Sequence, residues 1–207
     1  MKDTLYNKFS SLFHSPLSTM SAAALLVTAS VRLSFAIITA CALLWQYLIC
    51  IFITNIAKSV FPKKNGAFTS VLLAAFIGSV FYLILYFINP LLAIETGLFT
   101  GIVPILFAAS GFSAAAQTAT LQMALLHAFR EALSTGLLII ALSCVREPLG
   151  FATLTLPGGD MGIFELFNNT ALYPFPVRII ASSCGALLLL GYALLIFRHI
   201  EGRGDRG

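Results

Sequence analysis

Long apolar stretches separated by short polar breaks dominate this chain. Four of them are close to the roughly 20 apolar residues that an α-helix needs to cross a bilayer. They cover residues 34–57, 67–88, 124–145 and 178–197. The stretches end at charged residues or at a turn signal such as Asn89-Pro90. This pattern predicts four regular membrane-spanning helices.

Two further apolar segments are less regular. Residues 17–31 are short and are closed by Arg32, and residues 91–111 are interrupted. The interrupting residues are Gly97, Gly101, Pro104 and Gly111. Each irregular segment opens a set of three, and such matching positions indicate an inverted repeat whose broken helices line a functional site. We therefore predict an all-α integral membrane fold with six transmembrane helices, arranged as two inverted three-helix repeats with broken helices 1 and 4.

The polar remainder of the chain is too short for a soluble domain of even about 50 residues. Residues 17–199 are therefore expected to form a single six-helix membrane domain. Before it, apolar side chains recur at helical spacing, which favours an interfacial segment over residues 1–16. Residues 200–207 are predicted to form a polar C-terminal tail.

Composition and charge agree with a membrane protein. The chain is 59% hydrophobic and 10% charged, whereas about a quarter of the residues in soluble domains are charged. The net charge of +4 does not call for a nucleic acid partner, because basic residues also mark the cytoplasmic side of membrane proteins. With six spans, nine Lys and Arg residues lie on the side of both termini and three on the other. We expect a lipid bilayer as the surroundings, in the inner (cytoplasmic) membrane, with both termini cytoplasmic.

The stretch "CVREPLGFATLTLPGGD" at 144–160 places charged and polar residues, a proline and a Gly-Gly turn at the end of the apolar stretch 124–145. Arg146 and Glu147 are adjacent, so on a helix they do not face each other and need separate partners. Two interpretations remain open. The pair fixes an outer loop against a partner subunit or an ion path, or Pro148 ends the helix and the charges mark the headgroup zone. Glu95 is a second candidate for an ion path, with the headgroup zone again as the alternative.

The residues of this stretch resemble a motif of the RnfE/NqrD family, membrane subunits of the Rnf and sodium-pumping NADH:quinone reductase complexes. The family reads roughly R-E-x-L/I-G-x-G-T-L. The matching residues are Arg146, Glu147, Leu149, Gly150, Thr153 and Leu154, while Ala152 replaces the second glycine. The segment "GLFTGIVPILFAAS" at 97–110 is similar to a second family segment.

The resemblance implies a [2Fe–2S] cluster shared with an RnfA/NqrE-like sister subunit, with one cysteine from each broken helix. Here Ser110 stands at one ligand position, and residues 22–26 contain no cysteine for the other. Fe–S clusters require thiolates, so the expected ligands are absent. The four cysteines lie elsewhere, at Cys41, Cys50, Cys144 and Cys184.

Taken together, the residues and the resemblance lead us to expect a scaffold-like membrane subunit of an Rnf/Nqr-type ion-translocating electron-transport complex. It would be at most a non-catalytic subunit of an oxidoreductase complex. The alternative is a small-solute transporter component, such as the substrate-binding subunit of an energy-coupling-factor importer. A membrane assembly factor is a third possibility.

Overall fold

The structure is a computed structural model that describes residues 25, 27–56, 66–109, 121–158, 163–168 and 178–204. The described part is mostly helical and carries one pair of strands. Its elements in chain order are α3 (Leu33–Ile56), α4 (Gly66–Ile88), α5 (Pro90–Ala109), α7 (Leu121–Phe151), β1 (Thr153–Pro157), β2 (Ile163–Asn168), α8 (Arg178–Ala181) and α9 (Ser183–Gly204).

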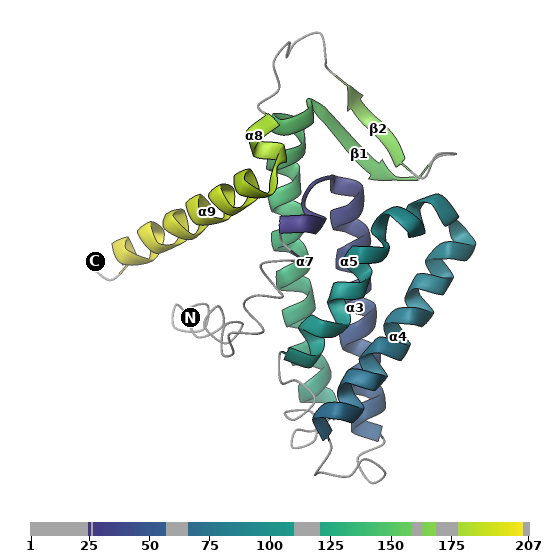
Figure 1. Ribbon diagram of the computed structural model, residues 1–207. Helices are drawn as coiled ribbons and strands as arrows, with labels where there is room; N and C mark the ends of the chain where they lie inside the picture. The colour runs from purple at the N-terminus through teal and green to yellow at the C-terminus, as the bar shows by residue number, and fades with distance from the viewer. Residues whose placement is uncertain are drawn as a thin grey trace.

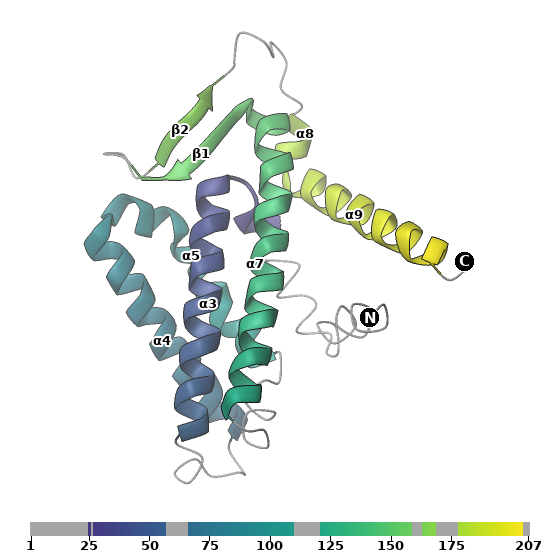
Figure 2. The ribbon, with the colours of Figure 1, turned by 180° about the vertical axis from the view of Figure 1, so that it is seen from behind.

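Four of these helices, α3, α4, α5 and α7, are long and apolar enough to cross a membrane. They correspond to the segments predicted at 34–57, 67–88, 91–111 and 124–145, so these helices are confirmed as elements. In both views of the ribbon, α3 and α7 run side by side, and the α4–α5 pair packs against α3 (Figures 1 and 2). The arrangement into six spans with an inverted repeat stays a prediction.

Small side chains allow α3 and α7 to lie close together. A Cβ added to Gly136 of α7 would come within 3.0 Å of the Cβ of Ala40 on α3. Beside this contact, Leu43, Phe107 and Ile139 are fully buried in one apolar cluster. In an apolar solvent, such close packing of small residues is what holds helices together, because burying apolar surface from lipid gives little gain.

The turn between α4 and α5 follows from two residues. The Oδ1 of Asn89 accepts a hydrogen bond from the backbone N–H of Leu92 at 3.1 Å, which is the N-cap contact that satisfies a free amide at a helix start. Pro90 occupies the first position of α5, where its fixed φ fits a helix and its missing N–H costs nothing. The sequence "NP" therefore reverses the chain within one residue.

Helix α5 corrects the prediction of a broken fourth helix. It runs without interruption from Pro90 to Ala109 and passes through Gly97, Gly101 and Pro104. A proline removes one helical hydrogen bond, and buried helices tolerate this loss when neighbours support the backbone. Ser110 and Gly111 lie outside the described residues.

The two strands correct the prediction of an all-α fold. β1 and β2 pair antiparallel, with Thr153 opposite Asn168 and Pro157 opposite Ile163. The alternation in "TLTL" at the start of β1 has the period of a strand, and Gly158 follows β1 with φ of 146°, a value that favours glycine. The hairpin covers the end of the bundle where α7 finishes (Figure 1).

The last predicted spans also differ in detail. The span expected at 124–145 continues to Phe151 with Pro148 inside the helix, so Pro148 does not end it. The span expected at 178–197 is divided into α8 and α9 at Ser182, and α9 extends to Gly204, into the predicted tail. Of the predicted first span, residues 17–31, the chain is helical at 27–29 and turns at 30–32; residues 1–16 lie outside the described residues.

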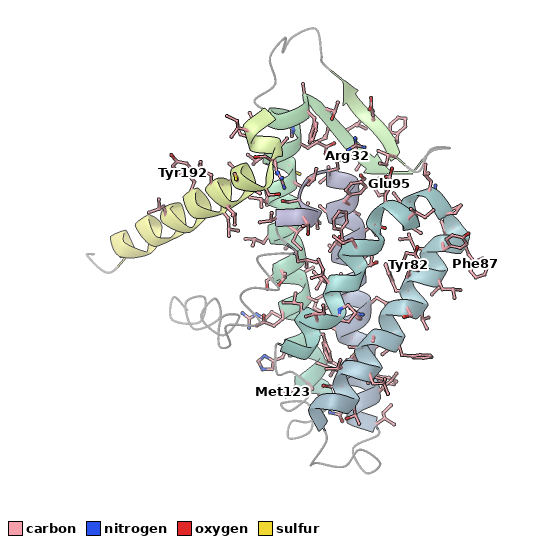
Figure 3. All side chains as sticks on the ribbon, in the orientation of Figure 1. Arg32, Tyr82, Phe87, Glu95, Met123 and Tyr192 are labelled. Carbon is pink, nitrogen blue, oxygen red and sulfur yellow. The ribbon has the colours of Figure 1, made fainter. Side chains whose placement is uncertain are left out.

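Large apolar side chains cover much of the outer surface of the helices. Phe76 and Phe87 on α4, Leu98 on α5 and Leu126 on α7 are each more than 60% exposed. Figure 3 shows Phe87 projecting outward from the bundle and Tyr192 from α9. A soluble monomer rarely exposes such extended apolar surface, whereas lipid-facing helices require it.

Candidate functional site

Arg146, near the end of α7, lies in the interior, with 1% of its side chain exposed. Its Nη1 donates to the carbonyl of Val27 at 2.6 Å and to Oγ of Ser30 at 3.0 Å. Its Nε donates to the carbonyl of Ile180 at 3.0 Å. Its Nη2 donates to the carbonyls of Ala181 at 2.6 Å and Ser182 at 3.0 Å. All five N–H groups of a guanidinium are thus used, and four of the five acceptors are backbone carbonyls.

These carbonyls lie where helices are interrupted. The helical turn at 27–29 stops before α3 begins, and α8 stops at Ala181 before Ser182. The last carbonyls of a helix have no partner within it, and they carry partial negative charge that favours a cation. Arg146 therefore binds carbonyls at the ends of two helical segments that are more than 140 residues apart in the chain. It also binds the carbonyl of Ser182, which accepts the first backbone hydrogen bond of α9 from Ala186.

Glu147 performs the complementary task at a helix start. Its Oε2 accepts a hydrogen bond from the backbone N–H of Leu33 at 2.7 Å, and the side chain is fully buried. Leu33 is the first residue of α3, and the preceding Arg32 has no side-chain oxygen to cap it. A carboxylate is the favoured partner at a helix N-terminus. Glu147 thus caps α3 from a different helix.

These contacts bear on both interpretations of the Arg-Glu pair. The expectation that Pro148 ends the helix is wrong, because α7 continues to Phe151. Both side chains are buried within the protein, and their place in the headgroup zone stays a prediction. The pair does fix structure, but in the described residues its partners belong to this chain itself. A role toward a partner subunit or an ion stays a prediction.

The other motif residues position this pair. A Cβ on Gly150 would meet the Cβ of Ala181 at 2.9 Å, so glycine lets α8 approach α7 closely enough for Arg146 to reach its carbonyls. Ala152 ends α7 with φ of 56°, the left-handed conformation common after a helix. Thr153 then begins β1, where it pairs with Asn168.

Two buried oxygens beside this network have no hydrogen-bond partner among the described residues. They are Oε1 of Glu147 and Oγ of Ser143. Residues four apart share one helix face, so both oxygens lie on the same side of α7. Nearby at the start of α3, the hydroxyl of Thr155 donates to Oγ of Ser34 at 3.3 Å, and both side chains are buried.

The remaining predicted residues are not part of this network. Glu95 is exposed on α5, and Figure 3 shows it toward the hairpin end of the bundle, as it does Arg32. On the same helix, Gly97 packs against the ring of Tyr82 on α4, with 3.2 Å from an added Cβ to the ring, and Gly101 faces open space. The contact of Gly97 is one of helix packing.

The potential metal ligands of the described residues do not form a self-contained metal site. Nowhere in the described ranges do three or more Cys, His, Asp or Glu side chains gather as a metal site. Cys50 is buried, whereas Cys41, Cys144 and Cys184 are exposed, and all four are free cysteines. Leu25, within the stretch where the resemblance implies the first ligand, is a buried aliphatic residue.

No protein-family model matches this chain, and a comparison with curated proteins also finds no match. The resemblance to the RnfE/NqrD family therefore rests on the residues of the chain alone.

Sequence reasoning identified Arg146 and Glu147 but none of their partners. Ser182 lies at the junction of α8 and α9, whereas the sequence pattern predicted one continuous span over residues 178–197. Its side chain accepts from the N–H of Gly185 at 3.3 Å, an N-cap contact, and the "SSCG" sequence at 182–185 carries that signal. Ser143 and Glu147 could have been noted from their spacing of four on one apolar helix.

Proposed function

We propose that this chain is a multi-pass subunit of an ion-translocating electron-transport complex of the Rnf/Nqr type, in the inner membrane, where it acts as a scaffold. The observation that supports this proposal best is the buried Arg146–Glu147 pair, which occupies the most specific motif of the resemblance. The pair binds the ends of interrupted helical segments, and interrupted helices in membrane proteins are typical of ion and substrate sites.

The surface of the helices fits a multi-pass protein that is surrounded by lipid and by sister subunits. Exposed apolar side chains occur on α4, α5, α7 and α9. In this proposal the basic residues place both termini in the cytoplasm, and an RnfA/NqrE-like subunit is the main neighbour.

A scaffold role is favoured over a redox role because thiolates are missing where the resemblance implies cluster ligands. Ser110 stands at one of these positions, and the described residues hold no group of three or more metal ligands. Electron transfer through such a complex would use cofactors that other subunits hold.

The test is gentle detergent purification of the tagged protein from its native membrane, followed by mass spectrometry of its partners and by iron analysis and EPR spectroscopy. We expect Rnf/Nqr-like subunits to co-purify. A [2Fe–2S] signal in that sample should survive replacement of Ser110 by Ala and of all four cysteines by Ser. Loss of the signal in this variant would contradict the scaffold role.

A second outcome would overturn the proposal as a whole. If the purified protein carries a small solute, contains no iron and associates with an ATPase module, it is a transporter component.

A matched control variant for the purification, Arg130→Lys, changes an exposed basic residue of α7 and should leave partner recovery unchanged. It controls for effects of expression.

A further inference from the structure

The carboxylate of Glu147 has an unusual electrostatic environment. It is fully buried, and in the described residues only one of its oxygens has a partner, the N–H of Leu33. A buried carboxylate with an unsatisfied oxygen is costly unless a charge or hydrogen bond compensates it. Something must therefore complete the environment of Oε1.

Arg146 does not supply this compensation, although it is the next residue. Its guanidinium uses all five N–H groups on Val27, Ser30 and the three carbonyls of residues 180–182. Its positive charge is thus matched with the partial negative charge of helix ends. The N–H of Leu33 places only the partial positive charge of one helix start beside Glu147. In the described residues the carboxylate is therefore not matched by a full positive charge.

Hydroxyl side chains lie on the two helices that Glu147 joins. Ser143 lies one turn earlier on the same face of α7, and its buried hydroxyl has no partner in the described residues. Cβ atoms at this spacing are about 5–6 Å apart, so the two side-chain oxygens can share one small ligand. Ser34 follows Leu33 directly, and its hydroxyl is paired with Thr155 by a long bond of 3.3 Å.

We propose that Glu147 and Ser143, with the hydroxyls of Ser34 and Thr155 beside them, form a binding site for one small monovalent cation, for which Na⁺ is the probe. Carboxylate and hydroxyl oxygens are ligands for hard cations, and transition metals prefer nitrogen and sulfur. Divalent hard cations usually take more than one carboxylate or keep several waters. A single carboxylate among uncharged hydroxyls matches a single positive charge.

This inference deepens the proposed function, because an ion-translocating complex needs an ion site within the membrane subunits. It can fail separately, since binding is measured on the purified full-length chain and does not depend on partners. The partner analysis of the previous section tests the complex, and the experiment below tests the site.

The experiment is equilibrium binding of ²²Na⁺ to the purified full-length protein in lipid nanodiscs, with thermal unfolding in Na⁺ and in choline as a second readout. We expect saturable binding of one ion and a higher unfolding temperature in Na⁺, because a ligand that binds only the folded state stabilises it. Glu147→Gln keeps the size and the acceptor for Leu33 but removes the charge, so it should weaken binding by about tenfold or more.

Ser143→Ala is the sharper variant, since the Ser143 hydroxyl makes no hydrogen bond in the described residues and its loss should not disturb folding. We expect several-fold weaker Na⁺ binding with unchanged stability in choline. Ser79→Ala, at an exposed hydroxyl of α4, and Glu165→Gln, at an exposed carboxylate of β2, are the matched controls.

Two results would overturn the site. The first is the absence of saturable Na⁺ binding to the folded wild-type protein. The second is binding that Ser143→Ala and Glu147→Gln leave at the wild-type level while both variants fold. Either result would mean that Oε1 of Glu147 and Oγ of Ser143 bind water rather than Na⁺. The role of Glu147 would then be to cap α3.

Discussion

Arg146 and Glu147 are neighbours in the chain, yet their side chains bind opposite kinds of helix end. Arg146 binds carbonyls at Val27 and at residues 180–182, where one helical segment stops and, after Ser182, the next begins, and Glu147 binds the first N–H of α3. One turn of α7 therefore binds the end of the turn at 27–29, the start of α3 that follows it, and the distant junction of α8 and α9. In a bilayer no water satisfies free backbone groups. A helix can be interrupted there only if other groups, such as these two side chains, bind its free N–H and C=O groups.

Replacing Arg146 by Lys should destabilise the protein although the charge is kept. An ammonium has three donors and no planar fork, so at least two of the five acceptors lose their partner. Hydrogen bonds to charged groups contribute about 1.5–3 kcal/mol each, and we expect a loss of about 3 kcal/mol. Thermal unfolding in detergent measures this, with Arg130→Lys as the exposed control. Equal stability of the two variants would show that the bonds of Arg146 contribute little.

The sequence was sufficient to single out the Arg-Glu pair, because charges within an apolar pattern are rare and expensive. It was not sufficient to find their partners. Val27, Leu33 and Ala181 act through backbone groups, which any residue carries, so no side-chain pattern marks them. The break at Ser182 was missed for a related reason: the apolar residues continue on both sides of it.

Gly150 is predicted to be essential for the contact between α7 and α8. An added Cβ would approach the Cβ of Ala181 to 2.9 Å and its backbone N to 3.1 Å, and overpacking of this kind costs about 1–3 kcal/mol. Gly150→Ala should therefore lower the unfolding temperature. Gly101→Ala is the matched change, since an added Cβ there meets nothing within 4 Å. A Gly150→Ala protein as stable as Gly101→Ala would contradict this packing.

Periodicity predicted the long helices well and the irregular segments poorly. The segments at 34–57 and 67–88 became α3 and α4 with almost the same ends, because continuous apolar runs of that length have few alternatives in a membrane. In α5, Pro104 suggested a break, but tertiary packing keeps the helix continuous. The strand β1 was overlooked because its five residues begin with Thr153 and Leu154, the end of a motif that was interpreted only as a loop.

Ala152 is expected to be a position where glycine improves stability. Its φ of 56° costs an L-residue about 1–2 kcal/mol, whereas loss of the buried methyl costs about 0.8 kcal/mol. Ala152→Gly should thus stabilise the protein slightly, by about 0.5 kcal/mol, and would restore the glycine of the resembling motif. Ala128→Gly, in the interior of α7, should instead destabilise it by about 1 kcal/mol or more. A loss of stability in Ala152→Gly would show that the methyl packing dominates.

Gly185 should be the residue that fixes the junction of α8 and α9. A Cβ at this position would clash with the carbonyl oxygen of Ile179 and lie 2.5 Å from Cα of Ile180, and both atoms belong to backbone that cannot rotate away. Gly185→Ala must therefore shift the carbonyls that Arg146 binds. Gly191→Ala, further along α9 in open space, should be neutral or slightly stabilising.

The link between Gly185 and Arg146 can be measured directly by a double-mutant cycle. If Gly185→Ala displaces the acceptors of Arg146, the second substitution, Arg146→Lys, removes bonds that are already weakened. The combined loss in stability should then fall short of the sum of the single losses by about 1 kcal/mol or more, as for residues that share one network. Additive losses would mean that the junction keeps its geometry and that Arg146 binds it independently of Gly185.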